Sequence, residues 1–273
     1  MTPLQIRFGY ELSYEFPAPT AVVLLLHLRP ELGQRVLAPE QLQVHPPHIT
    51  TAEFIDGFGN RATRLIAPAG RLDLSCDATI ADDGQPAPID AHAGEHPVWA
   101  LPEDALPFLL PSRYCEVDLL GNLAWSLFGT TPAGWSRVQA VCDWVHRHLR
   151  FDYQLARATR TAYEAYREAT GVCRDFTHLA IALCRCLNIP ARYATGYLGD
   201  IGVPLDPNPM DFSAWMEVFL GGKWHVFDVR HNARRIGHLT MARGRDAADV
   251  AFTTTFGPHI LQRFVVRTFE VGR

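Results

Sequence analysis

Residues 171–198, GVCRDFTHLAIALCRCLNIPARYATGYL, decide how the second half of the chain folds. Apolar side chains at helical spacing predict a buried helix over about 173–187, ended by the Asn-Ile-Pro triplet that follows. The predicted buried stripe consists of Val172, Phe176, Leu179, Ala180, Leu183 and Leu187. Beyond Pro190 the pattern changes to that of a β-strand. Cys173 therefore stands at the first turn of a buried helix.

The position of Cys173 allows two interpretations. A thiolate at a helix N-terminus is favoured by unpaired main-chain N–H groups and by the helix dipole. The same N–H groups can hold the oxyanion of an acyl-transfer reaction, so Cys173 is a candidate nucleophile. Alternatively, Cys173 is a small core residue, because free cysteines are often buried.

Composition excludes several classes of function. The chain has 273 residues, 48% of them hydrophobic and 20% charged, which is typical of one large or two modest globular domains. A net charge of −4 without a basic run argues against nucleic acid or a membrane surface as partner. The start of the sequence does not have the pattern of a secretory signal, and the apolar run 21–28 is too short to span a bilayer.

The six cysteines have no framework spacing and include no CxxC pair. This pattern favours free thiols in a reducing compartment, so we expect a cytoplasmic protein. It also argues against a structural zinc site, and the sequence indicates neither a metal nor a cofactor.

The pattern along the chain predicts two parts and an α+β fold. Residues 5–80 alternate in polarity between turns, as in an antiparallel β-sandwich, and include a hairpin turn at 56–60. Residues 84–111 are rich in proline, which predicts an extended connector. Because a connector of this kind separates domains, we place the boundary near its end and predict domains 1–110 and 111–273. In the second part, helical patterns precede one antiparallel sheet. Its predicted strands are 191–198, 213–220, 223–229 and 263–271, and a short charged helix is predicted over 242–251.

A hairpin over 212–229, FSAWMEVFLGGKWHVFDV, carries the second set of candidate residues. Depending on the turn, Ser213 or Trp215 lies opposite Asp228, and in both registers these three side chains share one face. A carboxylate among aromatic residues needs a partner. Asp228 is thus a candidate site residue, or an acid at a strand end that bonds the loop after it.

These segments together resemble the bacterial transglutaminase-like family: GVCRDFTHLAIALCRCLNIPARYATGYL, then DFSAW and KWHVFDV. The resemblance implies a papain-like α+β core behind an N-terminal β domain. It also implies a Cys-His-Asp triad, of which Cys173 and Asp228 match two members. At the position of the family's histidine, this chain has Ser213. A serine hydroxyl cannot replace imidazole as general base at neutral pH.

Another histidine could supply the missing base. His225 falls on the opposite face of its strand, and His178 lies about 140° around the helix from Cys173. His231, three residues after Asp228 in a loop that can curl back, is the preferred substitute base; the alternative is an ordinary loop histidine. The sequence does not place His238 and His259.

Two further residues are candidate substrate contacts. Trp215 is expected either to line the substrate cleft or to be a tryptophan of the hydrophobic core. Asp175 is expected either to contact the substrate or to cap the N-terminus of its own helix.

Two functions follow from these residues. The first is a cysteine enzyme that performs acyl transfer or amide hydrolysis through a Cys173 thioester. Its substrate would be a peptide, a protein or an amide-bearing small molecule. The second is a binding or scaffold protein that keeps the fold without turnover, because Ser213 replaces the histidine.

Overall fold

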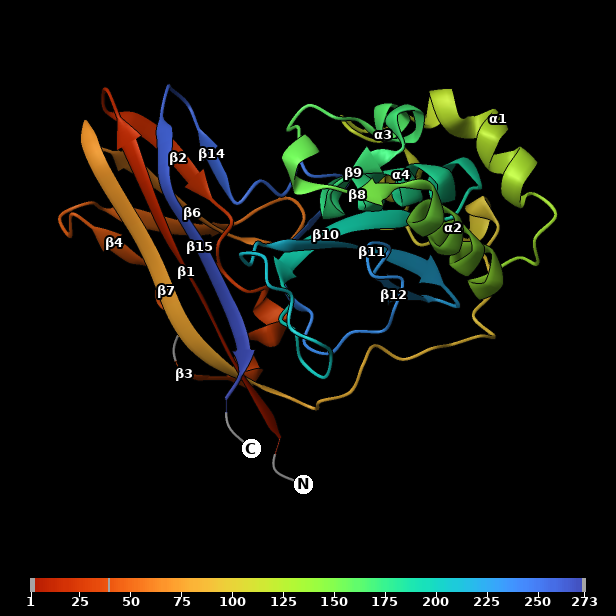
Figure 1. Ribbon diagram of the computed structural model, residues 1–273, viewed down its shortest axis with the longest axis horizontal. Coiled ribbons are helices and arrows are strands. Elements are labelled where there is room, and N and C mark those ends of the chain that lie inside the picture. The colour runs from red at the N-terminus through yellow and green to blue at the C-terminus, as the bar shows by residue number, and fades with distance from the viewer. Residues whose placement is uncertain (1–2, 39, 272–273) are drawn as a thin grey trace.

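The computed structural model describes residues 3–38 and 40–271, and its two parts lie side by side (Figure 1). One part is a pair of antiparallel β-sheets. The other is a group of helices packed on a smaller antiparallel sheet. The predicted α+β fold, with N-terminal antiparallel sheets before a helical core, is therefore confirmed.

The N-terminal sheets have the strand orders β15-β1-β7-β3 and β14-β2-β6-β5, with β4 also paired to β7. Their strands from the first part of the sequence are β1 (Leu4–Phe16), β2 (Thr20–Leu24), β3 (Val36–Ala38), β4 (Gln43–His45), β5 (Thr51–Ile55), β6 (Arg61–Ala67) and β7 (Gly70–Asp82). A 3-10 turn, η1 (Pro30–Arg35), lies between β2 and β3. The predicted hairpin turn at 56–60 joins β5 to β6, and Gly59 takes a φ of 77° there.

Two strands of this sandwich come from the far end of the sequence. They are β14 (Thr253–Thr255), which pairs with β2, and β15 (Ile260–Glu270), which pairs along most of β1. The prediction that 263–271 belongs to the second sheet is therefore wrong, because alternation identifies a strand but not its partner. The boundary near residue 110 stays a prediction.

The core part begins after the connector, which crosses from the sandwich to the helices (Figure 1). The connector 84–111 is not extended throughout, because it contains two 3-10 turns, η2 (Val98–Ala100) and η3 (Leu106–Leu109). The helices and the 3-10 turn of the core part are α1 (Val117–Phe128), α2 (Trp135–His148), η4 (Tyr153–Leu155), α3 (Ala162–Glu168) and α4 (Cys173–Cys186). Its sheet has the order β12-β11-β10-β13, formed by β10 (Ala191–Tyr197), β11 (Ser213–Leu220), β12 (Lys223–Phe227) and β13 (Leu239–Gly244). A small parallel pair joins β8 (Arg150–Phe151) to β9 (Thr170–Gly171).

Helix α4 is the central element of this core. It contacts α1, α2 and α3 as well as β10 and β11, and every residue from Asp175 to Arg185 is buried. The predicted helix over 173–187 is confirmed, including its first residue. Because α4 is enclosed, its start and rotation fix where Cys173 lies.

The start of α4 is held by Asp175. Its carboxylate accepts hydrogen bonds from the Val172 N–H at 2.9 Å and from the guanidinium of buried Arg160 at 3.1 Å. The carboxylate folds back so closely that a Cβ at Gly171 would lie 2.6 Å from the Asp175 Cβ. Glycine before Val172 is therefore required by this cap.

The hairpin of β11 and β12 takes the second of the two possible registers. Leu220 pairs with Lys223, and Gly221 and Gly222 form the turn with φ values of 57° and 81°. Met216 pairs with Phe227, so one further step places Trp215 beside Asp228. His225 pairs with Val218 on the other face, as alternation predicts.

The segment 242–251 does not form the predicted helix. Strand β13 continues to Gly244, and turns follow. The Asp246 carboxylate accepts the Ala248 N–H at 2.9 Å, and the Asp249 carboxylate accepts the Arg245 N–H at 2.9 Å. Such side-chain bonds to the main chain compete with helical hydrogen bonds, which is why the charged pattern folds as turns.

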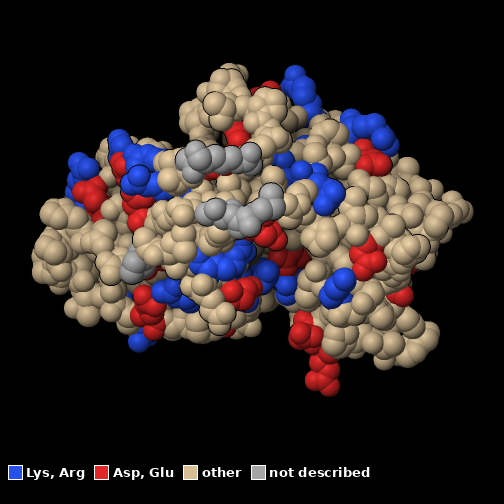
Figure 2. Space-filling model, turned by 90° about the horizontal axis from the view of Figure 1, so that it is seen from below, with Lys and Arg blue, Asp and Glu red and all other residues tan. Residues whose placement is uncertain are grey.

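The surface and the cysteines add two observations. On the face in Figure 2, basic and acidic side chains are interspersed. Within 3–38 and 40–271, no helix is both long and apolar enough to cross a bilayer. All six cysteines carry free thiols.

The cap of α4 yields a stability prediction. We expect Asp175→Ala to lower the free energy of unfolding by about 2–4 kcal/mol, because buried Arg160 loses a charged partner and an orphan N–H appears. Urea denaturation followed by circular dichroism measures this loss. Asp118→Ala, which removes a first-turn acid of α1, is the control and should cost less than about 1 kcal/mol. Equal losses in the two variants would contradict the role of Asp175.

Candidate active site

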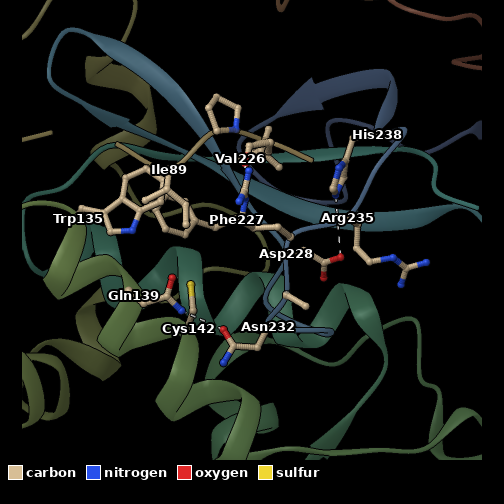
Figure 3. A pocket seen from close by; sticks show the side chains of 14 residues that line it. Ile89, Trp135, Gln139, Cys142, Val226, Phe227, Asp228, Asn232, Arg235 and His238 are labelled. Carbon is tan, nitrogen blue, oxygen red and sulfur yellow. Dashed lines mark hydrogen bonds and ion pairs between the residues drawn. The ribbon is translucent and has the colours of Figure 1, made fainter. Parts of the chain in front are cut away.

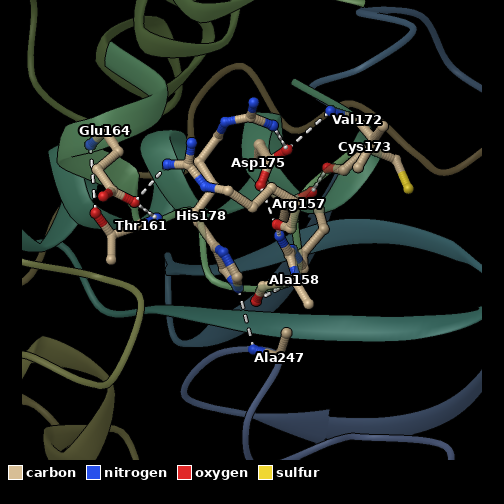
Figure 4. Close-up of polar contacts among 12 residues, drawn as sticks. Arg157, Ala158, Thr161, Glu164, Val172, Cys173, Asp175, His178 and Ala247 are labelled. Carbon is tan, nitrogen blue, oxygen red and sulfur yellow. Dashed lines mark hydrogen bonds and ion pairs between the residues drawn. The ribbon is translucent and has the colours of Figure 1, made fainter. Parts of the chain in front are cut away.

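Cys173 lies at the N-terminus of α4 and is partly exposed. It lines a cleft of about 520 Å³. In Figure 4 its sulfur points away from the cluster of Arg157 and Asp175 on the other side of the helix start. The thiol thus borders the cleft, while the rest of the residue packs against the hydrophobic core.

The cleft lies where the core meets the sandwich. One wall is the chain before α3 and the other is the chain that crosses from β13 to β14. Its lining comprises Tyr114, Ala156, Arg157, Ala158, Val172, Cys173, Arg174, Tyr193, Thr195, Asp211, Phe212, Ala214, Ala247, Ala248, Val250, Ala251, Phe252 and Thr253. Most of these side chains are small or aromatic, and Asp211 supplies a carboxylate near the thiol.

The protonation state of Cys173 differs from the expectation for a helix N-terminus. Loss of hydration around the sulfur, together with the charge of Asp211, raises the pKa of the thiol to about 12. The Arg230 guanidinium and the main-chain N–H groups of Ala214 and Arg174 lower this pKa, but by less. The expected depressed pKa is therefore wrong for this structure, because desolvation outweighs the helix terminus.

Asp228 and His231 form a hydrogen-bonded pair. His231 Nδ1 lies 2.7 Å from Asp228 Oδ2, and the His231 main-chain N–H donates to Asp228 Oδ1 at 3.0 Å. The imidazole and its hydrogen bonds lower the pKa of the Asp228 carboxyl, although burial opposes this effect. An ionised Asp228 then holds the Nδ1–H tautomer of His231 and leaves Nε2 as the basic nitrogen. The loop does curl back, as predicted.

A second imidazole approaches the same carboxylate. His238 Nε2 lies 3.9 Å from Asp228 Oδ2, and its ring meets the edge of Trp215 at 4.8 Å between centroids. Figure 3 shows His238 and Asp228 facing each other beside a cavity of about 110 Å³. Burial lowers the pKa of His238 to about 4, so this ring is neutral at pH 7.

His231 and Cys173 line neighbouring cavities. His231, Ser213 and Arg230 line a cavity of about 60 Å³, and Asp211 lines both this cavity and the cleft of Cys173. The loop 199–211 contributes Asp206 and Asn208 to the smaller cavity. Asp211 thus lines both the cleft of the candidate nucleophile and the cavity of the candidate base.

The two candidate substrate contacts lie inside the core. The Asp175 side chain is 0% exposed and is engaged in the helix cap, the alternative considered from the sequence. Trp215 is also 0% exposed and is absent from the lining of the Cys173 cleft. Neither side chain reaches the cleft surface in this structure.

The other histidines considered from the sequence, apart from His238, bond partners other than the thiol. His178 is buried, stacks on Tyr114 and accepts the Ala247 N–H at 3.1 Å. His225 bonds the Leu220 carbonyl, and His259 bonds Thr255 beside the sandwich. This agrees with the exclusion of His178 and His225 by helix and strand geometry.

The sequence indicated Asp211 as a cleft residue that would pair with a basic side chain, but it did not predict Arg230 and His238 near the thiol and Asp228. Asp211 stands two residues before Ser213, and this place at the start of β11 is the signal that identified it. Its pKa is raised by burial, and the part of the chain in the structure gives it no ion pair. Arg230 and His238 lie in the loop after β12, where side-chain direction cannot be read from periodicity. Among the described residues, no group of three or more His, Cys, Asp and Glu side chains is placed to hold a metal ion.

Comparison with known proteins agrees with this geometry. The sequence profile of the Transglutaminase-like superfamily matches residues 123–229, which include Cys173, Ser213 and Asp228 but end before His231. The structure is similar to that of a candidate cysteine protease from Cytophaga hutchinsonii, with a TM-score of 0.85 and 32% identity over 100% of this chain and 92% of that one. An uncharacterized protein of Mycobacterium leprae is 27% identical over 213 residues, 75% of each chain.

The match extends over the whole structure and not only over the core. The similar structure therefore covers the N-terminal sandwich, the α4 start and the β11–β12 hairpin together. This chain belongs to the transglutaminase-like superfamily.

Proposed function

We propose that this protein is a cysteine enzyme that cleaves or transfers acyl groups from amides through a Cys173 thioester. In this proposal His231 is the general base and Asp228 its orienting carboxylate. The observation that carries the proposal is the 2.7 Å bond between His231 Nδ1 and Asp228 Oδ2, because it supplies the imidazole–carboxylate pair that Ser213 cannot form. The similar Cytophaga hutchinsonii protein, which is described as a candidate cysteine protease, supports the same reaction class.

In the acylation step, Nε2 of His231 takes the proton of the Cys173 thiol as the sulfur attacks the carbonyl carbon of the substrate. The new C–S bond forms a tetrahedral intermediate, which collapses as the C–N bond breaks. The protonated imidazole then donates its proton to the leaving amine. Main-chain N–H groups at the start of α4 lie where they can stabilise the oxyanion.

Deacylation decides between hydrolysis and transfer. If water attacks the thioester, the products are a carboxylic acid and the free thiol; if an amine attacks, a new amide forms. We propose a peptide or protein as substrate, with an amide-bearing small molecule as the other option, and we favour hydrolysis in a cytoplasmic setting.

A second function, a binding or scaffold protein without turnover, is favoured by two features. Ser213 stands at the family's histidine position, and the pKa of Cys173 is raised to about 12, which leaves the thiol neutral at pH 7. In the enzyme, the proton must therefore leave in concert with attack or after substrate has changed the solvation of the sulfur. The experiments below separate the two functions.

The first test follows acetylation by p-nitrophenyl acetate, in which the thiol must attack an ester carbonyl. We expect mass spectrometry to find the acetyl group on Cys173 and Cys173→Ala to lose the release of p-nitrophenol. Cys186→Ser should retain it, which controls for the other partly exposed thiol. Acetylation of Cys173 no faster than that of Cys186 would favour the binding function.

The second test addresses the base. His231→Ala should slow acetylation by about 10²–10⁴-fold, because the proton acceptor is lost, whereas Ser213→Ala should change it less than about threefold. Adding Ser213→His to His231→Ala places an imidazole at the family's position and should restore part of the rate. A His231→Ala variant as fast as the parent would remove His231 from the mechanism.

The third test concerns the charges around the thiol. Iodoacetamide labels the thiolate, so a raised pKa predicts a Cys173 labelling rate that still increases about tenfold per pH unit between pH 8 and 10. Asp211→Asn removes a charge that raises the thiol pKa and should speed labelling at pH 9 by about three- to tenfold. Arg230→Gln removes a charge that lowers the pKa and should slow labelling.

The two substitutions act as controls for each other, because both change the lining of the same small cavity. Changes in the same direction would show a general opening of the site and not an electrostatic effect. Urea denaturation of both variants checks that the fold is retained.

A further inference from the structure

The cleft that holds Cys173 is bordered by a sheet edge that belongs to the sandwich. Thr253, the first residue of β14, lines this cleft together with Cys173. Strand β14 is the last strand of its sheet, paired only to β2 in the described residues. Cys173 and the first residue of an edge strand thus line the same cleft.

The main-chain groups of β14 alternate between the partner strand and the open edge. Phe252 O accepts the Leu25 N–H at 3.0 Å, and Phe256 N–H donates to Ala21 O at 3.0 Å. In an antiparallel pair, every second residue bonds the partner, so Thr254 also faces β2. The N–H and C=O groups of Thr253 and Thr255 therefore point outward, and the structure gives them no partner within the described chain.

Part of this wall has small side chains that another main chain can approach, beside the larger Val250 and Phe252. Ala247, Ala248 and Ala251 line the cleft just before β14. The Thr253 and Thr255 hydroxyl groups are engaged elsewhere, with Tyr14 at 2.9 Å and His259 at 2.8 Å. Where β14 borders the cleft, at Thr253, its outward main-chain groups are the hydrogen-bonding groups left to a ligand.

We propose that the substrate is a peptide segment that binds in extended form by adding a strand to the free edge of β14, which leads its amide to Cys173. Only an extended peptide presents N–H and C=O groups at the spacing that Thr253 and Thr255 require. This inference rests on the proposed function for the identity of the reacting bond. It adds that the sandwich, through a strand from the end of the sequence, forms part of the substrate site.

The ligand must satisfy two groups that border the cleft: the Cys173 thiol and the outward main-chain groups of β14. A compact amide-bearing molecule would reach the thiol but leave the outward groups of β14 unpaired. A second copy of this chain could pair with the same three-residue edge, and light scattering tests for that occupant. An extended peptide satisfies both the edge and the nucleophile.

Tethering tests the docking without requiring catalysis. In the Cys186→Ser variant, Cys173 is the partly exposed thiol that remains, and the other cysteines are buried. Two peptides, acetyl-Ala-Ala-Ala-Ala-Cys-amide and acetyl-Cys-Ala-Ala-Ala-Ala-amide, are attached to Cys173 as mixed disulfides at pH 9. They extend from the sulfur in opposite chain directions, so one of them can follow β14.

Amide hydrogen exchange by NMR then reports strand addition. We expect one of the peptides to slow exchange at Thr253 or Thr255 at least about tenfold, relative to protein carrying a single cysteine on Cys173. N-Methylation of alternate peptide nitrogens should abolish the protection. Strand β5, at the other edge of the same sheet, is the internal control: its amides at Glu53 and Ile55 should not change.

Complete attachment without protection by either peptide would overturn the proposal. Protection already present in the untethered protein, with a dimer mass by light scattering, would assign the edge to a second copy and also overturn it. Failure of the ester test with protection retained would remove the catalytic function while leaving the docking intact. The two proposals therefore fail separately.

Discussion

The carboxylate of Asp175 is the constraint on which the site depends. It bonds the Val172 N–H and the Arg160 guanidinium, and this fixes the first turn of α4. Because the rest of α4 is enclosed by helices and by β10 and β11, the helix cannot rotate to compensate for a change at its start. The direction of the Cys173 sulfur is thus set by a buried ion pair on the opposite side of the helix start.

The environment of the thiol shows two opposing effects. A helix N-terminus and Arg230 stabilise a thiolate, yet burial and Asp211 raise the pKa of Cys173 to about 12. Desolvation is the larger effect, since the sulfur lies inside the cleft and not on an open helix end. An activated thiol in this chain would therefore depend on a base that takes the proton during attack, which gives the Asp228–His231 pair its importance in the proposed mechanism.

The sequence predicted much of the fold and part of the site. The period of its apolar residues located α4 and its first residue, and alternation located the strands and showed that His225 points away from Asp228. The curl of the loop that brings His231 to Asp228 was proposed from spacing alone and is present in the structure. The approach of His238 and the place of Asp211 between two cavities could not be predicted, because loop side chains follow no period.

By itself, then, the sequence determined most of the helices and strands, because period and turn chemistry are local properties of the chain. The exception is 242–251, which forms a strand end and turns in place of the predicted helix. The sequence also specified the chemical residue types at the site: a thiol, a carboxylate and a serine in place of an imidazole. Only the tertiary structure decided that β14 and β15 join the N-terminal sheets, and that the thiol is desolvated. Strand partners and burial depend on residues far apart in sequence, and no local pattern contains that information.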